Sequence, residues 1–234
     1  MKSIPKSKSL IIFGLGDLAQ IGHEYFTHDS DYEVAAFTVD QQYMPADPVF
    51  CDLPVVPFDE LEASYPPSDF EMHCALVYMN MNRCRADACA RAKAKGYGLA
   101  SYISSHAFVS PSAKIGEHAF IFENNVIQSF VEIGDNAILW SGNHVGHSSK
   151  LGNNVFISSH VVISGWCDIG DNGFIGVNST LANNTKIGKE CWLQHASVIS
   201  GIVPDYSFVK GSDIMRLNEK ALSRALKKSA ENRQ

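Results

Sequence analysis

Histidine is the side chain in this 234-residue sequence best suited to moving protons, and five of its nine histidines are candidates for such chemistry: His118, His144, His147, His160 and His195. An imidazole has an ordinary pKa of about 6.5, so it can accept a proton from an amine or a hydroxyl at neutral pH. His147 is the first choice for a general base. His144, three residues earlier, could line the same cleft. His144 and His160 remain alternative bases.

A second constellation suits the binding of phosphates. Residues 14–19 read Gly-Leu-Gly-Asp-Leu-Ala, a G-x-G-x-x-A turn between an expected strand at 9–13 and a helical stretch that runs through Phe26. Glycines let the backbone approach a ligand, and a helix N-terminus favours anions. A second apolar strand, 34–39, ends in Asp40, where a ribose-binding acid would lie in a dinucleotide fold. A plain tight turn is the alternative.

A strict repeat must position the histidines. From Ile103 to Ile199 every sixth residue is aliphatic, and a small or slim side chain stands two places before the next one. Helices repeat at 3.6 residues and half-buried strands at 2, so a period of six fits neither. It predicts a β-solenoid of short strands joined by tight corners. Glycine corners such as Ile115-Gly116 and Ile133-Gly134 recur every 18 residues, which predicts a triangular coil of three hexapeptides.

The residues before the repeat alternate between apolar runs and one helical pattern. Further strands are expected at 55–57, 74–78 and 99–103, with a helix over 83–95. This alternation predicts a small parallel α/β layer. We therefore expect a Rossmann-like domain over residues 1–102, a β-helix over 103–211 and a tail over 212–234 that contains a basic helix at 218–228.

Bulk composition narrows the partners. The net charge of -6 and the pI of about 5.8 argue against nucleic acid as the main partner. The six cysteines show no zinc-site spacing and are expected to be reduced and buried. The apolar run near the N-terminus, 10–13, is too short for a signal peptide or a membrane span. A cytoplasmic enzyme or binding protein remains.

A small α/β domain followed by strict hexapeptides resembles the hexapeptide-repeat sugar acyltransferases, which include bacterial sialic acid O-acetyltransferases and nucleotide-amino-sugar N-acetyltransferases. The resemblance covers nearly the whole chain. It implies a left-handed parallel β-helix, a homotrimer as the active form, acetyl-CoA bound between neighbouring subunits, and no metal. It also implies that the N-terminal domain holds the nucleotide-activated sugar.

The resemblance assigns roles to particular residues. His147 matches the family's catalytic histidine, and Gly165, one coil later, matches a glycine whose amide meets the cofactor. Ser148 replaces an acidic residue that often follows the histidine, and Phe156 replaces a second histidine. The remaining expected contacts divide between the cofactor, which Gly165, Phe156 and His160 would touch, and the sugar nucleotide, which Gly14, Gly16, Asp17, Asp40, Asn82 and Arg83 would touch.

The expected function is acetyl-CoA-dependent N-acetylation of a nucleotide-linked amino sugar for the biosynthesis of surface polysaccharides. O-acetylation of a sugar is an alternative. A zinc-dependent β-helix hydratase could use His144, His147 and His160 as ligands, although it would not need the glycine turn. A non-catalytic protein that binds nucleotide sugars is a third alternative, consistent with Ser148 and Phe156.

Overall fold

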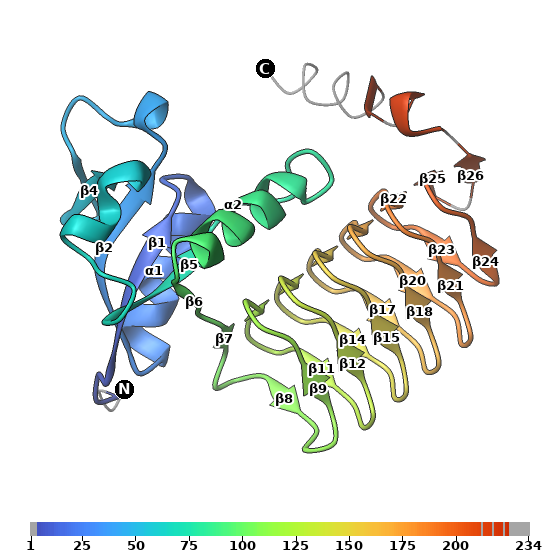
Figure 1. The fold of residues 1–234 in the computed structure, drawn as a ribbon. Coiled ribbons are helices and arrows are strands. Elements are labelled where there is room, and N and C mark those ends of the chain that lie inside the picture. Colours follow the sequence, from blue (N-terminus) through green and yellow to red (C-terminus); the bar gives the residue numbers. More distant parts are fainter. Residues whose placement is uncertain (1–3, 212, 217, 222, 225–234) are drawn as a thin grey trace.

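The computed structural model describes residues 4–211, 213–216, 218–221 and 223–224. Its N-terminal part is an α/β domain with one six-stranded sheet in the order β3-β4-β2-β1-β5-β6, parallel except for the β3-β4 hairpin (Figure 1). The strands are β1 (Lys8–Phe13), β2 (Tyr32–Val39), β3 (Val49–Phe50), β4 (Leu53–Pro57), β5 (Phe70–Cys74) and β6 (Gly98–Leu99). The helices are α1 (Asp17–Asp29), α2 (Arg83–Ala94), and the short 3-10 helices η1 (Gln41–Tyr43) and η2 (Phe58–Ala63).

Strand β1 is apolar on both sides because it lies at the centre of this sheet. Side chains alternate between the two faces of a strand. Leu10 and Ile12 accordingly join one core with Phe26 of α1, whereas Ile11 and Phe13 join another with α2. The two helices therefore cover opposite faces, and the carboxyl ends of β1, β2 and β5 meet at one edge of the sheet.

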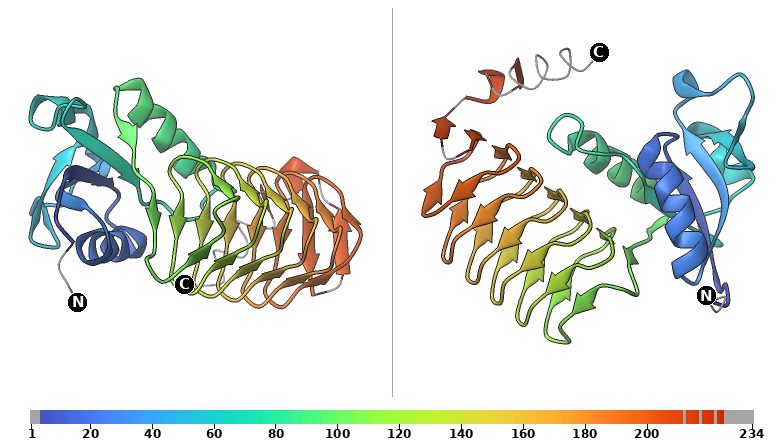
Figure 2. Two further views of the ribbon diagram at one scale, coloured as in Figure 1. Left: turned by 90° about the horizontal axis from the view of Figure 1, so that it is seen from below. Right: turned by 180° about the vertical axis from the view of Figure 1, so that it is seen from behind.

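The second part is a left-handed parallel β-helix of three sheets, and Figure 2 shows its coils stacked one on the next from two sides. Sheet I contains β7 (Tyr102–Ile103), β10 (Phe120–Ile121), β13 (Ile138–Leu139), β16 (Phe156–Ile157), β19 (Phe174–Ile175), β22 (Trp192–Leu193), β25 (Ser207–Lys210) and the antiparallel β26 (Asp213–Arg216). Sheet II contains β8 (Phe108–Val109), β11 (Val126–Ile127), β14 (His144–Val145), β17 (Val162–Ile163), β20 (Thr180–Leu181) and β23 (Val198–Ile199). Sheet III contains β9 (Lys114–Ile115), β12 (Glu132–Ile133), β15 (Lys150–Leu151), β18 (Asp168–Ile169), β21 (Lys186–Ile187) and β24 (Ile202–Val203).

The repeated aliphatic residues fill the prism, as the period predicts. From Ile121 onward every one of them is buried, whereas Ile103, at the open end of the first coil, is 39% exposed. Corner residues at regular six-residue intervals have positive φ, and asparagine, which tolerates that conformation well, is the commonest residue among them. The exceptions include Phe130 and Trp166, bulky residues at φ 63 and 61.

The outward faces of the three sheets differ in chemistry. Sheet I presents aromatic residues that pack against the α/β domain: Tyr25 and Phe26 of α1 make edge-to-face contacts with Tyr102 and Phe120. Sheet II presents apolar side chains to the exterior, Phe108 and Val198 among them, at 59% and 66% exposure. Sheet III presents charged residues, which include the Lys150–Glu132 ion pair.

Two expected strands are wrong in their bounds. The strand predicted at 74–78 is β5, which ends at Cys74. Ala75, Val77 and Tyr78 are apolar because they pack between the domains rather than in a sheet. The strand predicted at 99–103 is two short strands in different sheets, β6 and β7. Of the helix expected at 218–228, residues 219–221 and 223–224 are helical, and 225–228 lie outside the described residues. Within the described ranges, no helix combines the length and apolarity needed to cross a membrane.

Candidate active site

His147 lies at the corner where the chain passes from β14 of sheet II to β15 of sheet III, and its side chain is exposed. The backbone N–H of His147 donates to Gln128 Oε1 at 2.9 Å, one coil earlier. Its imidazole lies over Gly165, one coil later: a Cβ on Gly165 would stand 2.9 Å from Nε2. Only a glycine at 165 leaves room for this ring position.

The amide of Gly165 has a partner of its own. It donates to Asn183 Oδ1 at 2.9 Å, so the amide that the resemblance assigns to the cofactor is engaged by a side chain. Gly165 therefore serves the corner by having no side chain, which leaves room for the imidazole of His147. The ring of His147 also meets Trp166 edge-on, with centroids 6.0 Å apart.

No carboxylate orients this imidazole in the described part of the chain. Its Nδ1 lies 3.5 Å from Ser148 Oγ, at the limit of a hydrogen bond. The substitution of serine for an acidic residue therefore leaves the ring held mainly by packing against Gly165 and Trp166.

The other two candidate histidines lie apart from this corner. His144 is half-buried on the outward side of β14, between Val126 and Val162. His160 lies at the corner between sheets I and II, the far edge of sheet II, with its ring over Gly142. Within one protomer the three histidines do not bring their ring nitrogens together as a metal site would require.

Phe156 is the clearest correction to the expected site. It belongs to sheet I, is 3% exposed, and packs between Tyr78 of the α/β domain and Phe174 at centroid distances of 4.9 and 5.5 Å. Its burial between the domains rules out a direct contact with a cofactor at the His147 corner. An apolar aromatic residue suits this interdomain position better than the histidine that the resembling family has there.

A cavity of about 680 Å³ opens at the carboxyl edge of the α/β sheet. Four predicted residues, Gly14, Gly16, Asp40 and Arg83, line it together with Phe13, Leu15, Val39, Gln42, Tyr43, Leu76, Met79, Asn80, Cys84, Asp87, Ala88 and Arg91. It lies at the switch point of the sheet, where open α/β sheets bind ligands.

The glycine turn shapes the floor of this cavity. Gly14 has φ +120°, and a Cβ there would lie 3.2 Å from the carbonyl oxygen of Ala75. Gly16 caps α1, and the space that its Cβ would occupy is empty. A ligand can therefore approach the backbone at the N-terminus of α1. Asp17, the first residue of α1, is exposed and does not line the cavity.

Asp40 is already paired with a residue that the sequence did not single out. Arg91 of α2 donates to both carboxylate oxygens of Asp40, and its guanidinium lies 4.7 Å from the ring centroid of Phe58. The hydrogen bond with Asp40 raises the pKa of Arg91. Arg91 lies eight residues after Arg83, so the two side chains lie on one face of α2. This spacing is the only sequence signal that could have placed Arg91 at the cavity.

Asn82 lies outside the cavity wall. Its side chain is fully buried, and its Nδ2 donates to the carbonyl oxygen of Gly173 in the β-helix at 3.2 Å. Arg83, by contrast, reaches both the cavity and the β-helix, where it donates to Glu190 Oε2 at 2.6 Å.

One cluster of metal-ligand types is present among the described residues: Cys74, Cys89 and His118, all buried between the domains. The N–H of Cys74 donates to His118 Nε2 at 2.8 Å, so the ring proton lies on Nδ1 and points toward Asn136 Oδ1, 2.8 Å away. A metal on Nδ1 would force a proton onto Nε2, facing the N–H of Cys74. The hydrogen bonds therefore fit a thiol cluster better than a metal centre.

The comparisons agree with this architecture. The bacterial transferase hexapeptide family (six repeats) matches residues 112–147. No curated protein sequence gives a match. The acetyltransferase domain of PglB from Neisseria gonorrhoeae superposes with a TM-score of 0.77 at 26% identity, over 90% of this chain and 100% of that one. PerB from Caulobacter crescentus, in complex with CoA and GDP-perosamine, gives 0.77 at 24% identity over 90% and 97%. WeeI from Acinetobacter baumannii gives 0.60 at 16% identity over 90% and 100%. The hexapeptide-repeat model thus matches part of the β-helix, and the two-domain chain has the fold of the PglB acetyltransferase domain.

Proposed function

We propose that the chain transfers an acetyl group from acetyl-CoA to the amino group of a nucleotide-linked sugar, with His147 as the general base. The observation that carries the proposal is the exposed imidazole of His147, packed on Gly165 at the border of an exposed apolar face. The PerB structure, with CoA and GDP-perosamine, supports the choice of both substrates. A related structure is named a GDP-perosamine N-acetyl transferase, which favours an amine as the acceptor.

The reaction needs one proton to move. As the amine nitrogen attacks the thioester carbonyl carbon, the new C–N bond forms and the C–S bond breaks, and the amine must lose a proton that the departing thiolate can take up. The imidazole of His147 accepts the first proton and returns one to the sulfur. No covalent enzyme intermediate is required, because both substrates are held together and proximity supplies much of the rate.

The cavity at Gly14 and Gly16 suits the nucleotide of the substrate. The phosphates of the nucleotide are negatively charged, and both the N-terminus of α1 and the guanidinium of Arg83 attract negative charge. The Asp40 carboxylate keeps lone pairs beyond those used by Arg91 and can accept ribose hydroxyls.

The exposed face of sheet II suits a homotrimer. Phe108, Val126, Val162 and Val198 repeat along it at 59%, 37%, 41% and 66% exposure. His144 and Thr180 lie between them in the same row, and an exposed face that is mainly apolar marks a protein interface. His147 lies at the border of this face, so a neighbouring subunit would form the second wall of the acetyl-CoA site.

We further propose that the product serves surface-polysaccharide synthesis in the cytoplasm.

The test is the purified chain with acetyl-CoA and a panel of UDP-, GDP-, dTDP- and CMP-linked amino sugars, monitored by release of the CoA thiol. Turnover with at least one nucleotide class is expected. Hydroxylamine treatment of the product distinguishes the acceptors, because it cleaves an acetyl ester and leaves an acetamide intact. Absence of turnover across the panel would contradict the proposal.

A further inference from the structure

The loop between β5 and α2 contains three consecutive residues in the left-handed region. Asn80, Met81 and Asn82 have φ values of 50°, 53° and 63°. Asparagine visits this region readily, but methionine does not. Such conformations persist where the surroundings impose them, and they gather at functional sites.

The far end of the loop is fixed by the β-helix through Asn82. Its Nδ2 donates to the carbonyl oxygen of Gly173 at 3.2 Å, and its Oδ1 accepts from Arg85 Nη1 at 3.1 Å. Asn82 is fully buried, and Met81 is 4% exposed. Both polar groups of the amide are therefore satisfied by residues outside the loop.

Arg85 fixes the near end of the same loop. Its guanidinium is fully buried and donates to the carbonyl oxygens of Leu76 and Val77 at 3.4 and 3.3 Å. It also donates to the side chain and backbone carbonyl oxygens of Asn136, at 2.8 and 3.1 Å. All the acceptors of this guanidinium in the described chain are neutral, so its position depends on several hydrogen bonds at once.

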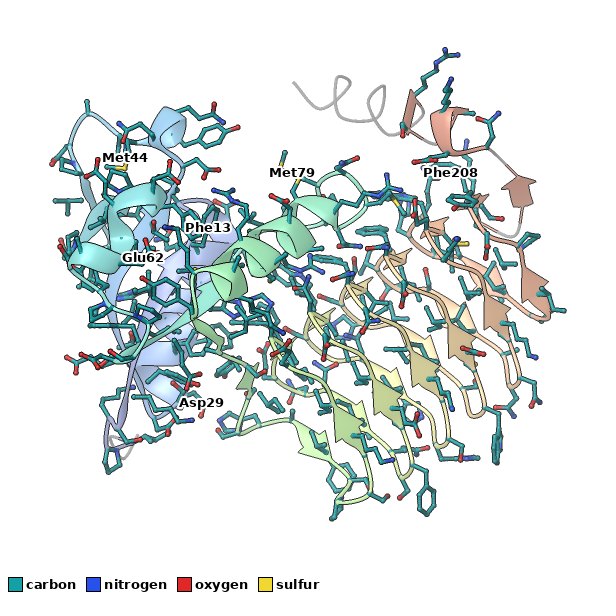
Figure 3. All side chains as sticks on the ribbon, in the orientation of Figure 1. Phe13, Asp29, Met44, Glu62, Met79 and Phe208 are labelled. Carbon is teal, nitrogen blue, oxygen red and sulfur yellow. The ribbon has the colours of Figure 1, made fainter. Side chains whose placement is uncertain are left out.

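Tyr78 adds an apolar anchor. Its ring meets Phe156, Phe174 and Trp192 of sheet I edge-on, at centroid distances of 4.9, 4.8 and 5.6 Å. The loop is thus held by the β-helix on both sides of its tip. The tip residues, Met79 and Asn80, are exposed and line the 680 Å³ cavity; Figure 3 labels Met79 on this loop.

We propose that Asn82 is a positioning residue for the sugar nucleotide: it contacts no substrate, and it holds Met79 and Asn80 as a wall of the cavity by anchoring the loop to Gly173. This inference rests on the proposed function, and it reassigns Asn82 from the substrate contact that the sequence suggested. The β-helix thereby shapes the nucleotide pocket of the other domain.

The experiment compares two variants of the full chain. Asn82→Gly keeps the left-handed backbone accessible but removes both side-chain bonds, so a failure to fold through backbone strain is avoided. We expect the KM for the sugar nucleotide to rise about tenfold, because the loop that carries Met79 and Asn80 loses its hydrogen bonds to Gly173 and Arg85. The KM for acetyl-CoA and kcat at saturation should stay within about twofold. Asn82→Asp keeps the acceptor for Arg85 but turns a carboxylate oxygen toward the carbonyl oxygen of Gly173, so the sugar-nucleotide KM should rise about as much as in Asn82→Gly.

The matched control is Asn124→Gly, another asparagine with positive φ, φ 58, exposed at a corner of the β-helix. Its kinetic constants should be those of the wild type. A wild-type sugar-nucleotide KM in Asn82→Gly would overturn the positioning role, as would an equal rise in both KM values. Failure of the proposed function looks different, because then the wild-type chain itself shows no turnover with any sugar nucleotide.

Discussion

Arg91 donates two hydrogen bonds to Asp40 at the wall of the nucleotide cavity, and both side chains are only partly exposed. A bidentate pair fixes the plane of the carboxylate as well as its charge. The carboxylate that the sequence marks as a ribose contact is thus held in place by a residue from the opposite end of the domain sequence.

Replacing Arg91 with Met should free Asp40 to turn away from the cavity. We expect the KM for the sugar nucleotide to rise about fivefold to tenfold and the KM for acetyl-CoA to stay unchanged. Steady-state kinetics measure both. Lys93→Met is the control, because Lys93 lies on the exposed surface of the same helix and pairs with Glu117 of the β-helix. Equal KM values in wild type and Arg91→Met would show that the pair does not position the substrate.

Gly165→Ala should displace the imidazole of His147, because the new Cβ would lie 2.9 Å from Nε2 and 3.0 Å from Cε1. The expected result is a fall in kcat of about a hundredfold with little change in the KM for the sugar nucleotide. Gly22→Ala, within helix α1, is the matched control. The new Cβ would lie 3.9 Å from the ring of Phe120, which is an ordinary van der Waals contact. It should raise the melting temperature slightly and leave kcat alone. Full activity in Gly165→Ala would argue against the ring position described.

A charge on sheet II should separate the subunits of the proposed trimer. Val162→Glu places a carboxylate in the apolar face beside His144, and sedimentation velocity should show a shift from trimer to monomer with loss of acetyl-CoA binding. Ile202→Glu is the comparison on sheet III, where the residue is 73% exposed on a charged face. It should remain trimeric. A trimeric Val162→Glu would place the subunit interface elsewhere.

The buried thiol cluster should make stability depend on pH. A hydrogen bond from Cys74, with His118 and Arg85 nearby, lowers the pKa of Cys89 to about 5, whereas an unfolded cysteine titrates at about 8.5. A group whose pKa is lower in the folded state adds stability that is full above the unfolded value and is lost as the pH falls through the folded value. The same interaction raises the pKa of Cys74, which withdraws stability above the unfolded value. The advantage of wild type over Cys89→Ser in urea unfolding should therefore be largest near pH of about 8.5 and shrink toward pH of about 5. Parallel pH profiles for the two proteins would contradict a thiolate at Cys89.

The sequence predicts the β-helix well because the repeat is local. Each hexapeptide contains its own buried aliphatic residue and its own corner residues. The glycine turn and Asp40 are also local, and they do line one cavity. Residues that act between the domains could not be predicted from local sequence patterns. Phe156 and Asn82 are buried by contacts with residues far away in the chain, such as Tyr78 and Gly173. Arg85 and Arg91 stand in an ordinary helical stretch, and only the packing of α2 shows what they hold.

The central claim is that His147 removes the proton from the acceptor, and His147→Ala tests it most directly. With the best sugar nucleotide from the panel, kcat should fall by about a hundredfold to ten-thousandfold, the range for loss of a general base, while both KM values and the trimer persist. His195→Ala, an exposed histidine at another corner of the β-helix, should retain wild-type kcat. If His147→Ala turned over at the wild-type rate, the base would lie elsewhere and this account of the site would be wrong.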